Sequence, residues 1–200
     1  RSTLFPYTTL FRSLFILSLG STAADARARA FARLVQGIAL GNLSLAYDSA
    51  SILTETDNPQ ADAGVVVPLS HYSAVNTAAL GYLDSAIAIA TANSAAFPLP
   101  VTANFWINGI ALTQADFIRV ARSYKARFRA HVARTPAERA LVDWGAVIID
   151  ANAGLTADFT PKMDAANGWD VSWMAQHFAS SAWHQMPQFF IAMEIGRAHV

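Results

Sequence analysis

The sequence predicts an all-α fold of antiparallel helix pairs, followed by a loop-rich aromatic segment. Apolar residues recur at three- and four-residue steps in four stretches between about residues 24 and 154, a spacing that gathers them on one face of a helix. Alanine, which has the highest helix propensity, is frequent in these stretches. After residue 155 this period is lost, and tryptophan and phenylalanine cluster between residues 168 and 190.

The first stretch predicts a helix over residues 24–53. A stripe of small residues, Ala30, Gly37 and Gly41, would let a second helix approach closely. The turn-rich residues 54–59 cannot continue the helix. The predicted buried face consists of Phe31, Leu34, Val35, Ile38 and Leu45.

The second stretch predicts a helix over residues 70–91. The segment after it contains Pro98 and Pro100, which favour a loop because proline removes a backbone donor and restricts the preceding residue. The predicted core face of this helix is Val75, Ala78, Ala79, Tyr82, Leu83, Ala86 and Ile89.

A third helix is predicted to begin after Thr113. Thr113 and Asp116, three residues later, resemble a capping box in which Asp replaces the usual Glu. The apolar spacing that follows places one face of the helix in the core through four turns. That face is Phe117, Val120, Ala121, Tyr124, Phe128 and Val132.

The fourth helix is predicted to start at Thr135, with Pro136 at the tolerated first position and Glu138 completing a capping box. Gly154 is expected to end it in a left-handed turn. Only two residues separate this helix from the third one, so the two should form an antiparallel hairpin. The residues expected to point inward are Leu141, Trp144, Val147 and Ile148.

A weak internal repeat accompanies these helices. The pattern Ala39–Leu43, with Ala, Leu and Gly followed by Leu two residues on, recurs forty residues later at Ala79–Leu83. Such a repeat is typical of a short tetratricopeptide-like array, although that repeat usually spans about 34 residues. A chance match in an alanine-rich chain is the alternative.

Both ends of the chain resemble translated short-read sequencing adapters. Residues 1–13 and residues 194–200 can each be back-translated into such an adapter. We therefore expect the natural part to be residues 14–193, an internal fragment of a longer protein, and exclude both ends from the fold. Within it, residues 14–154 are predicted to form the helical part of one domain, and residues 155–193 the start of its loop-rich region.

The composition excludes several classes of protein. Without the two ends, Lys plus Arg falls from 14 to 11 and Asp plus Glu from 14 to 13, so the net charge changes from 0 to −2. A near-neutral chain offers no electrostatic reason to bind nucleic acid. The hydrophobic content of 54% is too high for a disordered chain. Cysteine is absent, which excludes a disulfide framework and a thiolate metal site.

Six basic residues lie on or just after the third helix, but carboxylates occur near them in the sequence. We interpret this region as a solvated or ion-paired helix face rather than as a nucleic-acid surface, because the chain as a whole carries no positive net charge. The cations are Arg119, Arg122, Lys125, Arg127, Arg129 and Arg134, and the nearby carboxylates are Asp116, Glu138, Asp143 and Asp150.

The sequence proposes no catalytic centre, no metal site and no cofactor. His177 and His184 are seven residues apart, with Asp170 seven residues before His177, but no HExxH motif supports a metal. Ser180 and Ser181 lie outside any Gly-x-Ser-x-Gly elbow. We therefore expect a protein that is not an enzyme.

Tryptophans in or beside loops are the candidate ligand-binding residues. An exposed indole ring offers a flat surface on which the apolar face of a sugar can stack. Covering the edge of a core is the alternative role for a loop tryptophan. The candidates are Trp106, Trp169, Trp173 and Trp183.

Several short segments of the helical region, taken together, resemble one family of binding proteins. They are Arg27–Phe31, Gly37–Gly41, Tyr47–Ala50, Ala79–Ile87, Ala121–Phe128, Asp143–Ile148 and Gly154–Leu155. At these positions the chain resembles the SusD/RagB family of outer-membrane nutrient-binding lipoproteins, over about residues 23–160. The match lies in diffuse helical patterns rather than in an invariant site motif.

The resemblance implies a non-enzymatic, surface-exposed lipoprotein of the cell outer membrane that binds an oligosaccharide or another nutrient. Its signal and its lipidated N-terminal cysteine would lie upstream of this fragment. The implied partner is a SusC-like, TonB-dependent transporter, which the tetratricopeptide-like helices would face. No ligand-binding residue of the family is carried over to a numbered position in this chain.

Two other functions remain open from the residues alone. One is a tetratricopeptide-type scaffold that binds a protein or peptide in a helical groove. The other is a helical hydrolase, for which the chain shows no supporting motif. A transporter gene immediately upstream would favour nutrient capture over the scaffold.

Overall fold

A computed structural model of the chain describes residues 23–54, 67–99, 107 and 110–161. Their helices and strands all belong to one compact unit, which takes in residues up to Leu99 and residues 111–159. The all-α prediction is confirmed for this part of the chain, with the addition of two short strands. The elements are α2 (Ala23–Ala46), β1 (Ser49–Ser51), β2 (Leu69–His71), α3 (Tyr72–Ala92), the 3-10 helix η1 (Ser94–Ala96), α4 (Gln114–His131), α5 (Pro136–Ala140) and α6 (Trp144–Asn152).

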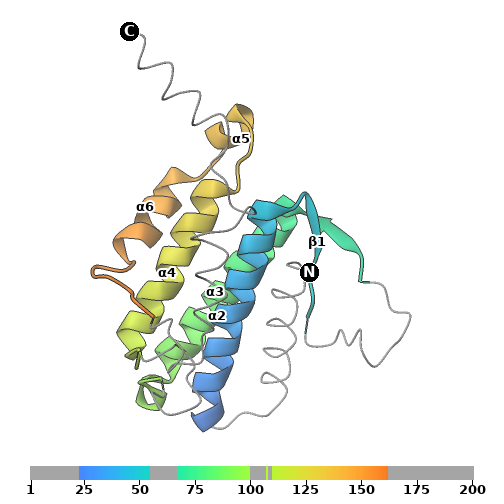
Figure 1. Cartoon of the computed structure of the whole chain (residues 1–200). Coiled ribbons are helices and arrows are strands. Elements are labelled where there is room, and N and C mark those ends of the chain that lie inside the picture. Colours follow the sequence, from blue (N-terminus) through green and yellow to red (C-terminus); the bar gives the residue numbers. More distant parts are fainter. Residues whose placement is uncertain (1–22, 55–66, 100–106, 108–109, 162–200) are drawn as a thin grey trace, which may run out of the picture. The chain divides into compact units, whose positions relative to one another are not determined.

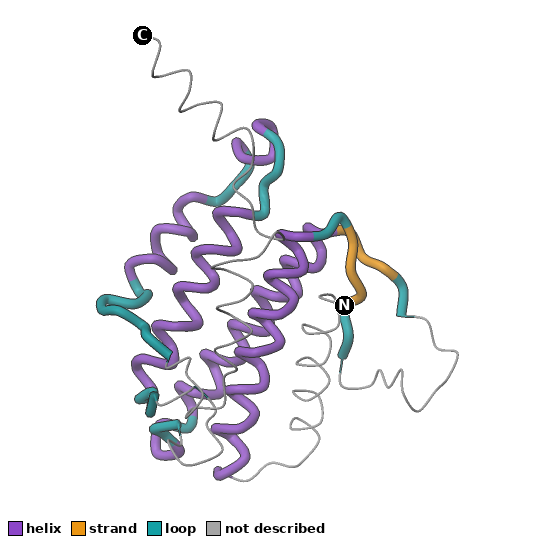
Figure 2. The backbone as a smooth tube through the Cα atoms, in the orientation of Figure 1, coloured by secondary structure: helices purple, strands orange, loops and turns teal. Residues whose placement is uncertain are grey.

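The long helices run alternately in opposite directions (Figures 1 and 2). Helix α2 packs against α3, α3 against α4, and α4 against α6, while α2 also reaches α4. Each long helix is thus antiparallel to the next one in the chain. The predicted hairpin, with two residues between its helices, differs from the observed pair: α4 packs against α6, and α5 lies between these two helices in the chain.

The first helix is shorter than the sequence predicts. Helix α2 ends at Ala46, and the expected helical residues beyond it form β1, which pairs in antiparallel fashion with β2. The Tyr72 N–H donates to the Asp48 carbonyl at 2.9 Å, and the Ser51 hydroxyl donates to the Val67 carbonyl at 3.0 Å. These partners lie far along the chain, so tertiary hydrogen bonds override the local helical period.

The small-residue stripe brings α2 close to two other helices. A Cβ on Gly37 would lie 2.6 Å from Cγ of Leu83 on α3. A Cβ on Gly41 would lie 2.2 Å from Cε2 of Phe128 on α4. The close approach predicted from these glycines is therefore confirmed. Around this contact lies a core cluster of Leu40, Leu43, Ala50, Val75 and Ala79.

The predicted faces of the second and third helices are mostly confirmed. Thr113 caps α4 by accepting the Asp116 N–H at 3.2 Å, as expected. The flanking members of the two faces, such as Tyr82 and Val132, are half-buried because they lie at the edge of the contact. The fully buried members are Val75, Ala79, Leu83 and Ala86 on α3 and Phe117, Val120, Ala121 and Phe128 on α4.

The predicted fourth helix is two helices with apolar residues facing outward. The Thr135 capping box is present and starts α5, but Asp143 caps a new helix, α6, by accepting the Ala146 N–H at 2.9 Å. The inward prediction is wrong for three residues and Val147 is only half-buried. The buried residue of α6 is Asp150, which turns the apolar side of the helix away from α4. The exposed residues are Leu141 (85%), Trp144 (45%) and Ile148 (58%).

Gly154 also has a role other than the predicted one. Helix α6 ends at Asn152, and the φ of Gly154 lies outside the left-handed region. A Cβ at this position would lie 2.6 Å from Oγ of Ser123 on α4. The same hydroxyl accepts the Leu155 N–H at 2.9 Å. Glycine is therefore required here by close approach to α4.

The two copies of the sequence repeat differ in their surroundings. Gly41 is buried against Phe128, whereas a Cβ on Gly81 would meet no heavy atom within 4 Å. The leucines that end the two patterns, Leu43 and Leu83, are both buried. The two segments thus share a buried leucine but not a helix-contact glycine.

This difference gives a matched pair of variants. We expect Gly41→Ala to destabilise the chain by about 1–3 kcal/mol, because the new methyl group overlaps the Phe128 ring. Gly81→Ala should stabilise it by about 0.5–1 kcal/mol, because alanine has the higher helix propensity and the site is open. Urea unfolding followed by circular dichroism measures both. Equal effects of the two substitutions would contradict the packing described for α2 and α4.

Candidate functional site

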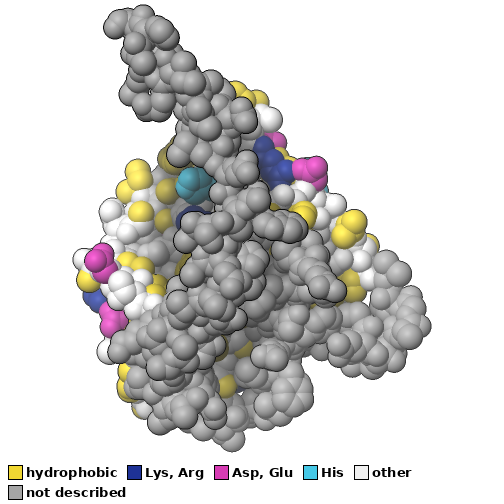
Figure 3. Space-filling view, in the orientation of Figure 1, with side chains coloured by type: hydrophobic (Ala, Val, Ile, Leu, Met, Phe, Trp, Pro, Cys, Tyr) yellow, Lys and Arg dark blue, Asp and Glu magenta, His cyan; other side chains and the backbone are white. Residues whose placement is uncertain are grey.

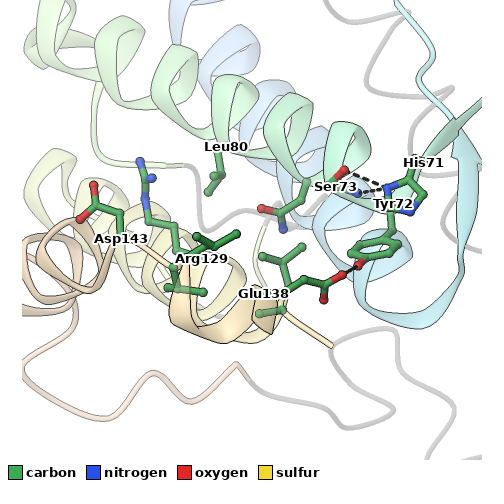
Figure 4. A pocket seen from close by; sticks show the side chains of 12 residues that line it. His71, Tyr72, Ser73, Leu80, Arg129, Glu138 and Asp143 are labelled. Atoms are coloured by element: carbon green, nitrogen blue, oxygen red, sulfur yellow. Dashed lines mark hydrogen bonds between the residues drawn. The ribbon is translucent and has the colours of Figure 1, made fainter. Parts of the chain in front are cut away.

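A cavity of about 420 Å³ opens between the start of α3 and the end of α4 with α5 (Figure 4). Its apolar lining includes Leu80 of α3, together with Val132 and Val142. Hydrogen-bonding side chains line the rest. A concave, mainly apolar surface with a few polar groups is the usual form of a small-ligand site.

His71 and Ser73 lie at one end of the cavity (Figure 4). His71 precedes α3 and its Nδ1 accepts the Ser73 N–H at 3.4 Å, so the imidazole caps the helix. The same nitrogen lies 2.9 Å from the Ser73 hydroxyl. Since Nδ1 accepts from the backbone, the hydroxyl donates to it as well, and the contact is a structural cap.

Arg129 and Asp143 also line the cavity, and both appear on the side away from His71 in Figure 4. The Arg129 Nε donates to Oδ2 of Asp150 at 2.9 Å, and its two terminal nitrogens have no partner among the described residues. Asp143 uses Oδ1 to cap α6, and its second oxygen likewise has no described partner. Each side chain is therefore anchored by one atom, and its other polar atoms have no partner among the described residues.

Arg134 contacts two of the lining residues, Tyr72 and Glu138, and also binds the end of α2. Its Nη2 donates to the carbonyls of Ser44 at 3.0 Å and Tyr47 at 2.7 Å, and its Nη1 pairs with Asp48. Its guanidinium carbon lies 3.9 Å from the centroid of the Tyr72 ring. One side chain thus supplies partners for the last carbonyls of α2, which a helix end otherwise leaves unsatisfied.

Glu138 links this arginine to the start of α5. The Tyr72 hydroxyl donates to its Oε1 at 2.5 Å, and its Oε2 accepts the N–H groups of Arg134 at 2.7 Å and Thr135 at 3.1 Å. The bond from Tyr72, followed by the one from the Arg134 backbone, holds the pKa of Glu138 below its usual value. The same bond to Glu138 raises the pKa of the Tyr72 hydroxyl. Glu138 is therefore engaged as an ionised structural group.

A buried ion cluster lies behind the Arg129 end of the cavity. Asp150, with 3% of its side chain exposed, accepts from Nη1 of Arg122 at 2.6 Å and from Nε of Arg129. Nζ of Lys125 lies 3.4 Å from Asp150 and 2.5 Å from Oδ1 of Asp84 on α3. Burial raises the pKa of Asp150, but the Arg122 bond, the Lys125 charge and the Arg129 bond outweigh it and lower the pKa overall.

The ion-paired interpretation of this helix face is confirmed for two of the four carboxylates. Asp150 pairs with three cations, and Asp116 pairs with Arg119 at 3.0 Å. Asp143 instead caps α6, and Glu138 accepts from Tyr72 and the backbone. The cluster also extends to Asp84, which the sequence reading did not include.

The candidate tryptophans, Trp106, Trp169, Trp173 and Trp183, lie outside the described residues, so their role remains a prediction. The same holds for His177 and His184. Among the described residues, no group of three His, Cys, Asp or Glu side chains is placed to hold a metal ion. The described helices include none with the length and apolar character needed to span a bilayer.

Comparison of the chain with protein-family models, with curated proteins and with solved structures gives no match. The cavity residues were not found from the sequence. Val132 and Leu141 were expected in the core, Glu138 in a helix cap, and Arg129 and Asp143 on one ion-paired helix face. No local pattern predicts a shared cavity for Arg129 and Asp143, because α5 lies between them in the chain.

The buried ion cluster predicts a pH-dependent stability. A carboxylate whose folded pKa is lowered contributes stability above its unfolded pKa of about 3.9, and loses it as the pH falls through the folded value. We expect Asp150→Asn to cost about 3 kcal/mol at pH 7, because three cations lose a buried partner. The difference from the unaltered chain should shrink below about pH 4. Urea unfolding from pH 7 to pH 3 measures it.

The control for this experiment is Asp116→Asn, which removes a carboxylate from an ion pair whose two side chains are 44% and 43% exposed. Its effect should stay below about 1 kcal/mol at every pH. A constant cost of Asp150→Asn across the whole pH range would contradict an ionised Asp150 in the folded state.

Arg134 gives a second stability prediction. Arg134→Lys keeps the charge but loses the planar group that spans two carbonyls and stacks on Tyr72, so we expect a loss of about 1–2 kcal/mol. Amide hydrogen exchange should speed up most in the last turn of α2. Arg139→Lys, on the exposed surface of α5, is the matched control and should change neither measurement. Uniform exchange in the Arg134 variant would contradict its role at the end of α2.

Proposed function

We propose that this chain is part of a non-catalytic binding protein, which captures a glycan or another nutrient at the outer membrane and passes it to a TonB-dependent transporter. The observation that carries this proposal is the open cavity, with an apolar wall and hydrogen-bonding groups at both ends. Such a surface suits a ligand that has apolar faces and polar edges. The resemblance to the SusD/RagB family supports the transporter as partner.

Binding and release are the whole of the proposed mechanism. The ligand's apolar face packs against Leu80, Val132 and Val142, and its polar edges exchange hydrogen bonds with water for bonds with the ends of the cavity. The net gain is modest because each protein bond replaces a water bond. Modest affinity suits hand-off, since the ligand must leave when the transporter accepts it.

A scaffold for protein binding is the second candidate, and one observation favours it. Large apolar residues of α6 and of the short loop before it are exposed, and hydrophobic side chains lie over α6 in the space-filling view (Figure 3). Contiguous exposed apolar surface often marks a protein contact. The tetratricopeptide-like interpretation of the helix pairs agrees with this use. The exposed residues are Leu141, Trp144, Ile148 and Ile149.

The complete, adapter-trimmed reading frame allows the two candidates to be tested. We expect its product to carry a lipidation cysteine, to bind a nutrient in isothermal titration calorimetry, and to copurify with the transporter encoded immediately upstream. The absence of both the cysteine and an adjacent transporter gene would overturn nutrient capture. Binding of a protein partner that Trp144→Ser and Ile148→Ser abolish, without any nutrient binding, would establish the scaffold instead.

A further inference from the structure

We propose that residues 135–142, which include α5, form a movable wall of the cavity, and that the hydrogen bond between Tyr72 and Glu138 holds this wall against α3. The position of the wall then decides whether the cavity is complete. This adds a means of regulation to the binding site of the proposed function, on which the inference rests.

The wall lies between two attached points of the chain. Before it, Arg134 binds the carbonyls of Ser44 and Tyr47 at the end of α2. After it, Asp143 caps α6, and Asp150 attaches this helix to α4 through three cations. The residues between these two points can therefore move while both attachments stay in place.

The wall has little packing of its own. None of residues 135–142 is fully buried: Glu138 and Val142 are half-buried, and the others are exposed. Helix α5 lies beyond the end of α4 in Figure 1, and it packs on the long helices far less than they pack on one another. Segments with few buried contacts open locally at a low free-energy cost. This part of the lining is therefore able to move while the long helices stay packed.

One side-chain hydrogen bond joins the wall to a distant element. The hydroxyl of Tyr72, at the start of α3, donates to Oε1 of Glu138 at 2.5 Å, and Figure 4 shows the two side chains facing each other. The other hydrogen bonds of residues 135–142 are local, such as those of the Thr135 capping box and of the turn at Leu141. Among the described residues, the bond from Tyr72 is thus the single hydrogen bond that attaches the wall to α3.

Movement of the wall changes the cavity. Glu138, Leu141 and Val142 all line it, so a displaced wall leaves the cavity without one side. Leu141 is 85% exposed although it is a lining residue. A bound molecule that covers Leu141 removes apolar surface from water, which favours the wall in its held position. An occupant therefore stabilises the wall, and loss of the Tyr72 bond favours its displacement and the release of the occupant.

The test compares the full 200-residue chain with Tyr72→Phe, which keeps the ring beside Arg134 and removes the hydroxyl. Because the sequence contains no cysteine, spin labels can be attached through Ala137→Cys on α5 and Ala88→Cys on α3, both exposed positions. Pulsed electron paramagnetic resonance measures the distribution of distances between the two labels. We expect Tyr72→Phe to shift the equilibrium about tenfold toward the displaced wall, and so to broaden this distribution.

Tyr124→Phe is the matched control. The ring of Tyr124 packs on Phe128, and its hydroxyl has no hydrogen-bond partner among the described residues. This substitution should leave the distribution unchanged. Glu138→Gln should change it less than Tyr72→Phe does, since glutamine also completes a capping box and its amide group can donate to the Tyr72 oxygen.

A reference pair of labels, at Ala88→Cys and at Arg127→Cys on α4, separates movement of the wall from loss of the fold. It should keep its distribution in Tyr72→Phe. Broadening of both pairs together would mean that the long helices have loosened, and would overturn the movable wall. An unchanged first distribution in Tyr72→Phe would overturn it as well, since the bond then does not hold the wall. Neither result bears on nutrient capture, which ligand binding by the complete protein tests separately.

Discussion

The buried carboxylate of Asp150 determines how α6 meets the rest of the helices. Three cations of α4 surround it, and one of them, Lys125, continues to Asp84 on α3. An unpaired charge at this depth would be strongly unfavourable, so α6 must present this residue to α4. The orientation of α6 then follows, and its apolar residues face away from the interface.

The same contact links the fold to the candidate site. Asp150 holds Arg129, which lines the cavity, by one nitrogen. At the opposite wall, Glu138 and Tyr72 are occupied by each other and by the backbone near Arg134. The polar groups of the cavity therefore differ: some maintain the fold, and the remaining atoms of Arg129 and Asp143 have no partner among the described residues.

The sequence predicted those features that depend on neighbours in the chain. Apolar period located α3 and α4, and cap residues located the start of α4 at Thr113 and the start of α5 at Thr135. It failed where distant partners decide the outcome. Helix α2 ends early because β2 and a remote arginine bind the residues beyond it. The buried face of α6 was predicted wrongly. The spacing of its apolar residues favours burial of the isoleucines, but three cations on α4 favour burial of Asp150 instead.

The contact between Arg134 and the end of α2 has a consequence for the order of folding. The two partners in the bond to the Ser44 carbonyl are 90 residues apart in the chain. Helix α2 therefore lacks its final cap until α3, α4 and the turn after α4 have been synthesised. Contacts of such long sequence separation form late, since they require the closure of a long loop. During translation, β1 must therefore pair with β2 before Arg134, which binds the end of α2, has been synthesised.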